Sequence, residues 1–190
     1  VGAEACTAGF YISYLKEVSG FGPAQTARFL TYYYIAATVV SLIGIYLLRV
    51  MSAGTLVALF GVGMIITYLL AAFTNSSLNP YYLVALGVFI SIMFPSLFSL
   101  GIEGIGSFTE KGSALINIAV VGGALFTPLQ GMVADATSVQ VSYLVPCFCF
   151  VLIVIYGIFC HKRYLRMKRI LPPDAAKGAE IGHAAGTGFI

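Results

Sequence analysis

Residues 93–137 read MFPSLFSLGIEGIGSFTEKGSALINIAVVGGALFTPLQGMVADAT, and this stretch decides the fold class of the chain. Two long apolar runs, each interrupted by proline and glycine, flank a short polar loop that holds two glutamates and one lysine. Charges confined to loops, together with interrupted apolar helices, are typical of membrane proteins whose broken helices line a cavity. The stretch therefore predicts a membrane protein.

The composition of the whole chain points the same way. Of its 190 residues, 59% are hydrophobic and only 9% are charged, and the mean hydropathy is +0.96. Soluble proteins carry roughly a quarter charged residues, so this chain cannot coat the surface of a soluble domain. The formal net charge is +3. Half of the ten basic residues form one block after the last apolar run: Lys162, Arg163, Arg166, Lys168 and Arg169.

About six apolar runs approach the ~20 residues that a membrane-spanning helix needs. They predict an all-α polytopic membrane protein, with residues 1–160 forming one six-helix transmembrane bundle and residues 161–190 a basic and then disordered tail. Because basic residues favour the cytoplasmic side, we expect a cytoplasmic C-terminus in a multi-pass protein of the inner or plasma membrane. The chain starts with valine inside an apolar run, which we interpret as the C-terminal part of a longer protein. The runs are 1–15, 29–48, 55–73, 81–100, 113–132 and 142–160.

Several classes of function are disfavoured by what the spans lack. There is no phosphate-binding glycine loop, no zinc-ligand helix and no His/Asp/Ser constellation, so an enzyme is the least favoured hypothesis. We expect no metal, no cofactor and no nucleic-acid partner. The four cysteines lie in or at the end of apolar runs and are interpreted as small apolar packing residues: Cys6, Cys147, Cys149 and Cys160.

Two polar residues inside apolar runs are candidates for a binding site. Glu4 is the one acidic residue expected within a span, where it could face a water-filled cavity, bind a sugar hydroxyl or carry a proton; the alternative is an interfacial position. Asn117 offers both a donor and an acceptor to a polyhydroxylated ligand, and the alternative is a hydrogen bond between helices. Gln130 lies ~220° around the same helix, so both amides cannot face one cavity.

Aromatic and helix-breaking residues supply the remaining candidates. Of three consecutive tyrosines, 32–34, at most two can face the interior, and an aromatic belt at the interface is the default interpretation. A platform for a sugar ring is the alternative, with Tyr33 as the candidate. Pro95 and Pro128 are predicted helix bends, and the pair Gly122 and Gly123 permits close helix packing or gating; such breaks lie near binding sites in transporters.

Several segments resemble the C-terminal six-helix half of a major facilitator superfamily transporter, and specifically the fucose–galactose–glucose:proton symporter family. The resemblance runs from residue 1 to about residue 160. The segments are VGAE at 1–4, FPSLFSLGI at 94–102, EKGS at 110–113, VGGA at 121–124, PLQG at 128–131, ADAT at 134–137 and YLVP at 143–146.

The resemblance implies sugar:proton symport by alternating access, with a fucose-, galactose- or glucose-like monosaccharide as substrate and the proton as the coupling ion. Phe94 would line the cavity wall, with Glu4 and Asn117 as polar lining. The partners would be the monosaccharide, the lipid bilayer and an N-terminal six-helix half that this chain lacks.

The chain departs from the family pattern at one position. The family has Gly-Arg-Phe in its eighth helix, where this chain has Val40, Ser41 and Leu42. The lost arginine leaves an alternative hypothesis open, a degenerate membrane sensor or partner module that does not transport.

Overall fold

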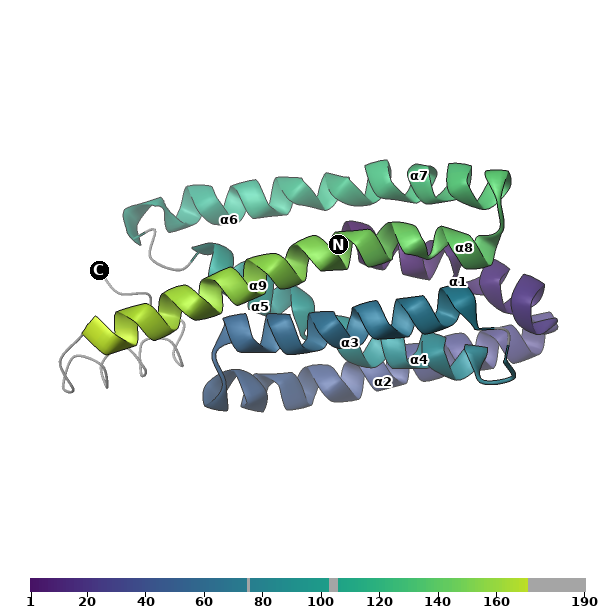
Figure 1. The fold of residues 1–190 in the computed structure, drawn as a ribbon, viewed down its shortest axis with the longest axis horizontal. Coiled ribbons are helices and arrows are strands. Elements are labelled where there is room, and N and C mark those ends of the chain that lie inside the picture. Colours follow the sequence, from purple (N-terminus) through teal and green to yellow (C-terminus); the bar gives the residue numbers. More distant parts are fainter. Residues whose placement is uncertain (75, 103–105, 171–190) are drawn as a thin grey trace.

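The computed structural model describes residues 1–74, 76–102 and 106–170, and every regular element in these ranges is helical. Glu103 of the predicted polar loop and the predicted disordered segment 171–190 lie outside the described residues. The long helices run side by side in an elongated bundle (Figure 1). The elements are α1 (Gly2–Ser19), α2 (Pro23–Val50), α3 (Ala53–Phe73), α4 (Asn79–Ile90), α5 (Met93–Ile102), η1 (Gly106–Phe108), α6 (Thr109–Ile118), η2 (Ala119–Val121), α7 (Gly122–Ala136), α8 (Val139–Ser142) and α9 (Leu144–Ile170).

Five helical segments of the described chain are long and apolar enough to cross a membrane: Pro23–Val50, Ala53–Phe73, Asn79–Ile102, Thr109–Ala136 and Val139–Arg163. They coincide with five of the predicted apolar runs, which confirms the all-α membrane fold. Helix α1 is not among the five, because its 18 residues include Glu4, Lys16 and Glu17. A sixth crossing by α1 stays a prediction.

The buried core lies where α1, α3, α4 and α9 meet. Helix α3 lies along α9, α2 packs on α4, and α1 packs on α7 (Figure 1). Four fully buried tyrosines from α1, α3 and the α8–α9 junction occupy the centre, with Tyr14 and Tyr143 ring centroids 4.9 Å apart. Their rings supply apolar bulk while each hydroxyl needs a partner. The four are Tyr11, Tyr14, Tyr68 and Tyr143.

Both ends of α3 are tied to neighbouring helices by side-chain hydrogen bonds. At its start, the Thr55 hydroxyl lies 2.9 Å from Nδ1 of His161 on α9. At its end, the Ala71 carbonyl accepts hydrogen bonds from the Tyr14 hydroxyl at 2.6 Å and from Nε2 of Gln140 at 3.1 Å. These bonds satisfy a carbonyl that a helix end would otherwise leave without an intrahelical partner.

The membrane segments 79–102 and 109–136 are interrupted. Helices α4 and α5 are separated at Ser91 and Ile92, and Pro95 has no N–H to give to the Ser91 carbonyl one turn earlier. Helices α6 and α7 are joined by the 3-10 turn η2, which ends directly before Gly122. Helix α7 continues through Pro128 without a break. Each segment therefore consists of two half-helices.

Candidate functional site

One side of α1 has no helix packed on it. A Cβ on Gly2 would lie 3.2 Å from the carbonyl oxygen of Gly122 on α7, so these backbones are in close contact. The ring of Tyr11 lies 5.4 Å from that of Tyr33 on α2, centroid to centroid. Glu4 is exposed. It therefore lies on the part of α1 that is left uncovered between α2 and α7.

Phe94 occupies an equivalent position on α5. A Cβ on Gly44 of α2 would lie 2.7 Å from the Ile92 side chain, and a Cβ on Gly101 would lie 2.7 Å from Ile116 of α6. Helix α2 thus contacts the residue directly before α5, and α6 contacts α5 near its end, while α3 packs on α5 from the core side, where a Cβ on Gly61 would lie 3.3 Å from Met93. Phe94 is 43% exposed on the side that remains. We call this side of the bundle, which carries Glu4 on α1 and Phe94 on α5 between α2 and α6–α7, the open face.

The two amides of the fifth apolar run have different surroundings, as their spacing predicted. Asn117 is exposed on α6, next to Ile116, which contacts α5. Gln130 is fully buried, and its Nε2 donates a 3.2 Å hydrogen bond to Oγ of Ser142 on α8. The amide of Asn117 is available to a ligand, whereas that of Gln130 connects α7 to α8.

Only one of the three consecutive tyrosines is buried. Tyr33 is 2% exposed, whereas Tyr32 and Tyr34 are 51% and 54% exposed. This agrees with the prediction that at most two rings face the interior. The ring of Tyr33 packs against Gly87 of α4, where a Cβ would lie 2.9 Å away. Tyr33 therefore lies between helices, and its neighbour Tyr34 presents its ring at the surface.

The structure also shows a row of exposed polar side chains on α2 that was not predicted as a group from the sequence. Four hydroxyl residues of α2 are exposed at intervals of three or four residues: Thr31, Tyr34, Thr38 and Ser41. Such spacing places side chains on one side of a helix. The spacing of these hydroxyl residues could have been recognised in the sequence as a polar side of the helix.

Metal-ligand clusters are absent from the described part of the chain: no three His, Cys, Asp or Glu side chains come together. The four cysteines are unpaired, with Cys6 and Cys147 buried. The chemistry that the open face offers is hydrogen bonding through the carboxylate of Glu4, together with the exposed aromatic ring of Phe94. Asn117 adds an exposed amide on α6.

No protein-family model matches the chain. Individual proteins do match. The chain is 33% identical over 164 residues to a glucose/galactose transporter of Brucella abortus, covering 85% of the chain and 40% of that protein. It is 29% identical over 161 residues to the L-fucose-proton symporter of Escherichia coli, covering 84% of the chain and 37% of the symporter.

The fold points to the same group of proteins. The crystal structure of FucP, a major facilitator superfamily transporter in the outward conformation, matches 84% of the chain with a TM-score of 0.80 and 28% identity. The match covers 39% of that structure. The chain thus spans about two fifths of the length of the proteins it matches, and these proteins are transporters, not enzymes.

Proposed function

We propose that the chain, which is similar to glucose/galactose and L-fucose transporters and to a solved major facilitator superfamily transporter, forms the C-terminal half of a fucose-permease-like sugar:proton symporter. The match to FucP over 84% of the chain carries the proposal. The open face supports it, because Glu4 and Phe94 lie on the same uncovered side of the bundle. A carboxylate and an aromatic ring that face the same space suit a monosaccharide, which offers hydroxyl groups to the first and an apolar ring face to the second.

Each candidate residue has a role in this proposal. Phe94 contacts the sugar ring, Glu4 accepts hydrogen bonds from sugar hydroxyls or carries the coupled proton, and Asn117 hydrogen-bonds the sugar. Tyr33 supports the site from behind, through its contact with Tyr11. The half-helix junctions bend during alternating access, one next to Pro95 and the other at Gly122 and Gly123, and Pro128 allows a further bend within α7.

The topology belongs to the same proposal. Helix α1 supplies a sixth crossing, the C-terminus lies in the cytoplasm, and a second six-helix half covers the open face. The proton is the coupling ion and no cofactor is needed. A reporter enzyme that is active on one side of the membrane only, fused after Ile190, tests the orientation.

Uptake tests the function. The product of the complete gene is reconstituted into liposomes, and the entry of labelled fucose, galactose and glucose is measured with and without a pH gradient, acidic outside. We expect uptake of at least one sugar, accelerated by the gradient. Absence of uptake for all three sugars under both conditions would contradict the proposal.

Two variants on α1 then test the site. Glu4→Gln removes the carboxylate from the open face and is expected to lower proton-coupled uptake. Glu17→Gln removes an exposed carboxylate near the other end of the same helix and should leave uptake unchanged. Equal uptake by the two variants would remove Glu4 from the site.

A further inference from the structure

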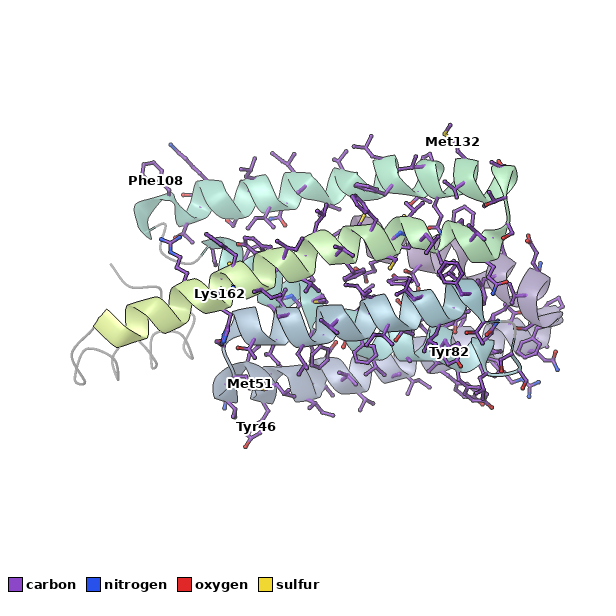
Figure 2. The ribbon with its side chains drawn as sticks, viewed as in Figure 1. Tyr46, Met51, Tyr82, Phe108, Met132 and Lys162 are labelled. Carbon is purple, nitrogen blue, oxygen red and sulfur yellow. The ribbon has the colours of Figure 1, made fainter. Side chains whose placement is uncertain are left out.

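The exposed surface of α2 divides into two arcs of different chemistry. At ~100° per residue, the large side chains of one arc, which we call the apolar arc, point outward: Ile35, Val39, Leu42, Ile43, Tyr46 and Val50. Tyr46 points away from the bundle in Figure 2. The other arc, which we call the hydroxyl arc, spans ~80° and between residues 31 and 41 consists of Thr31, Tyr34, Thr38 and Ser41, all exposed. One turn beyond Ser41 the same direction is taken by an apolar side chain, Ile45, so the hydroxyl arc ends at Ser41.

The two arcs suit different solvents. The apolar arc is suited to lipid. In the hydroxyl arc, Thr31 and Thr38 donate hydrogen bonds of 2.9 and 2.8 Å to the carbonyls one turn earlier, and each oxygen keeps its capacity to accept. Ser41 and Tyr34 make no such bond. Because unpaired hydroxyls are unfavourable in hydrocarbon, this arc is suited to water or to a polar ligand.

The hydroxyl arc lies on the α1 side of α2. The side of α2 that packs against other helices, which we call the packed strip, contains Phe29 and Tyr33. Tyr33 contacts Tyr11 of α1. Phe29 contacts Tyr81 of α4 and also Tyr32, whose ring borders the apolar arc. Helix α4 therefore flanks the apolar arc, and the hydroxyl arc lies across the packed strip, toward the open face.

The end of the hydroxyl arc lies at the depth of Glu4. Helices α1 and α2 are antiparallel and meet at Tyr11 and Tyr33. Glu4 precedes Tyr11 by seven residues, which on a helix means ~10 Å along the axis and nearly the same direction. Seven residues beyond Tyr33 the chain reaches Val40, directly before Ser41. The carboxylate of Glu4 thus lies at the level of Ser41, and Thr38 lies about 4.5 Å from Ser41 along the helix axis.

We propose that the hydroxyl arc of α2 lines the water-filled path of the substrate and that Thr38 and Ser41 hydrogen-bond an uncharged, polyhydroxylated sugar there. The inference rests on the proposed function and adds a specificity-determining surface to it. Threonine oxygens accept from sugar hydroxyls, the Ser41 hydroxyl donates, and Glu4 at the same depth accepts. Neutral groups of both kinds suit a ligand in which every hydroxyl is donor and acceptor.

Paired cysteine variants test the inference. In the complete protein with its native cysteines replaced, single cysteines are introduced as Thr38→Cys and, at the adjacent residue on the apolar arc, Val39→Cys. The pair Ser41→Cys and Leu42→Cys repeats the comparison one turn away. Membrane vesicles are treated with a charged, membrane-impermeant maleimide, with and without galactose, fucose or glucose. Thermal unfolding of each variant confirms that it is folded.

We expect the hydroxyl-arc cysteines to react roughly tenfold faster than their neighbours, because the thiolate is the nucleophile that attacks maleimide, and it forms in water and not in lipid. The transported sugar should slow the reaction at residues 38 and 41 only. Equal rates within both pairs, or rates that the transported sugar does not change, would overturn the inference.

Measuring sugar uptake distinguishes a failure of this inference from a failure of the proposed function. If sugar uptake is measured but the paired cysteines react alike, the proposed function stands and this inference fails. If no sugar is taken up, the proposed function fails and the sugar contact fails with it. Thr38→Val, which keeps the shape and removes the hydroxyl, should raise KM roughly fivefold, the effect of one lost hydrogen bond. Val39→Thr, the matched control, should leave KM unchanged.

Discussion

The hydroxyls of Thr7 on α1 and Tyr68 on α3 lie 2.5 Å apart inside the bundle, where both residues are buried. The Thr7 hydroxyl already donates to the Ala3 carbonyl at 2.9 Å. Since a hydroxyl has one hydrogen, Tyr68 must be the donor in the bond between them. The two ends of this bond are therefore not equivalent.

The asymmetry predicts unequal effects of removing each hydroxyl. Tyr68→Phe leaves Thr7 bonded to Ala3, so the expected loss is about 1 kcal/mol of unfolding free energy. Thr7→Val leaves the Tyr68 hydroxyl buried without its acceptor, and we expect a loss of about 2 kcal/mol. Thermal unfolding in detergent measures both. Thr31→Val, at an exposed hydroxyl, is the control; a larger effect for Tyr68→Phe than for Thr7→Val would contradict the assigned direction.

A second prediction concerns the contact between α2 and α4. A Cβ on Gly87 would lie 2.6 Å from the backbone carbonyl oxygen of Tyr33, which cannot move aside as a side chain could. Gly87→Ala should therefore destabilise the protein by about 2 kcal/mol through overpacking. Gly9→Ala is the matched control, because its Cβ would meet only a Thr127 methyl at 3.6 Å. The control should be neutral or stabilising, since alanine favours a helix over glycine.

A third prediction separates a binding ring from a packing ring on the same membrane segment. Phe94→Ala should raise the KM of uptake and leave the melting temperature nearly unchanged, because Phe94 lies on the open face. Phe89 packs edge-on against Phe60 with centroids 5.9 Å apart, so Phe89→Ala should lower unfolding free energy by about 2 kcal/mol. If both variants lost the same stability, Phe94 would be a packing residue and not a sugar-binding one.

A fourth prediction concerns the bond between Thr55 and His161. A double-mutant cycle of Thr55→Val and His161→Ala should give a coupling of about 1 kcal/mol, because either change removes the same 2.9 Å bond. The double variant should lose less stability than the sum of the single variants. Lys162 is exposed next to His161, and Lys162→Ala combined with Thr55→Val should be additive. Additive behaviour of the first pair would show that the bond contributes nothing.

Part of this structure could be predicted from the sequence. The apolar runs located five membrane segments because a bilayer requires long, uncharged helices. The angle between residues around a helix predicted that Asn117 and Gln130 face different surroundings. The same geometry predicted that at most two of the three tyrosines face the interior. These results depend only on helix geometry, which is the same in every helix.

The positions of the helix breaks could not be predicted in full. Pro128 lies within a continuous α7, whereas the interruption of that segment falls at η2, before Gly122. A proline removes one hydrogen-bond donor, but neighbouring helices decide whether the backbone bends there. The hydroxyl arc could likewise be identified only once the packed side of α2 was known. Periodicity shows which residues share one side of a helix, but it does not show which side packs against a neighbouring helix.

Helix α6 and the turn η2 have no buried side chain among their described residues, whereas the adjoining α7 docks on α1. Packing therefore contributes little to keeping Thr109–Val121 helical. In a bilayer the segment stays helical for another reason: an opened turn would expose amides and carbonyls to hydrocarbon, where no water can pair with them. In water or loose detergent that constraint disappears, and backbone amides of this segment should exchange hydrogen faster than those of α3. The secondary structure of α6 thus depends on its solvent more than on its neighbours.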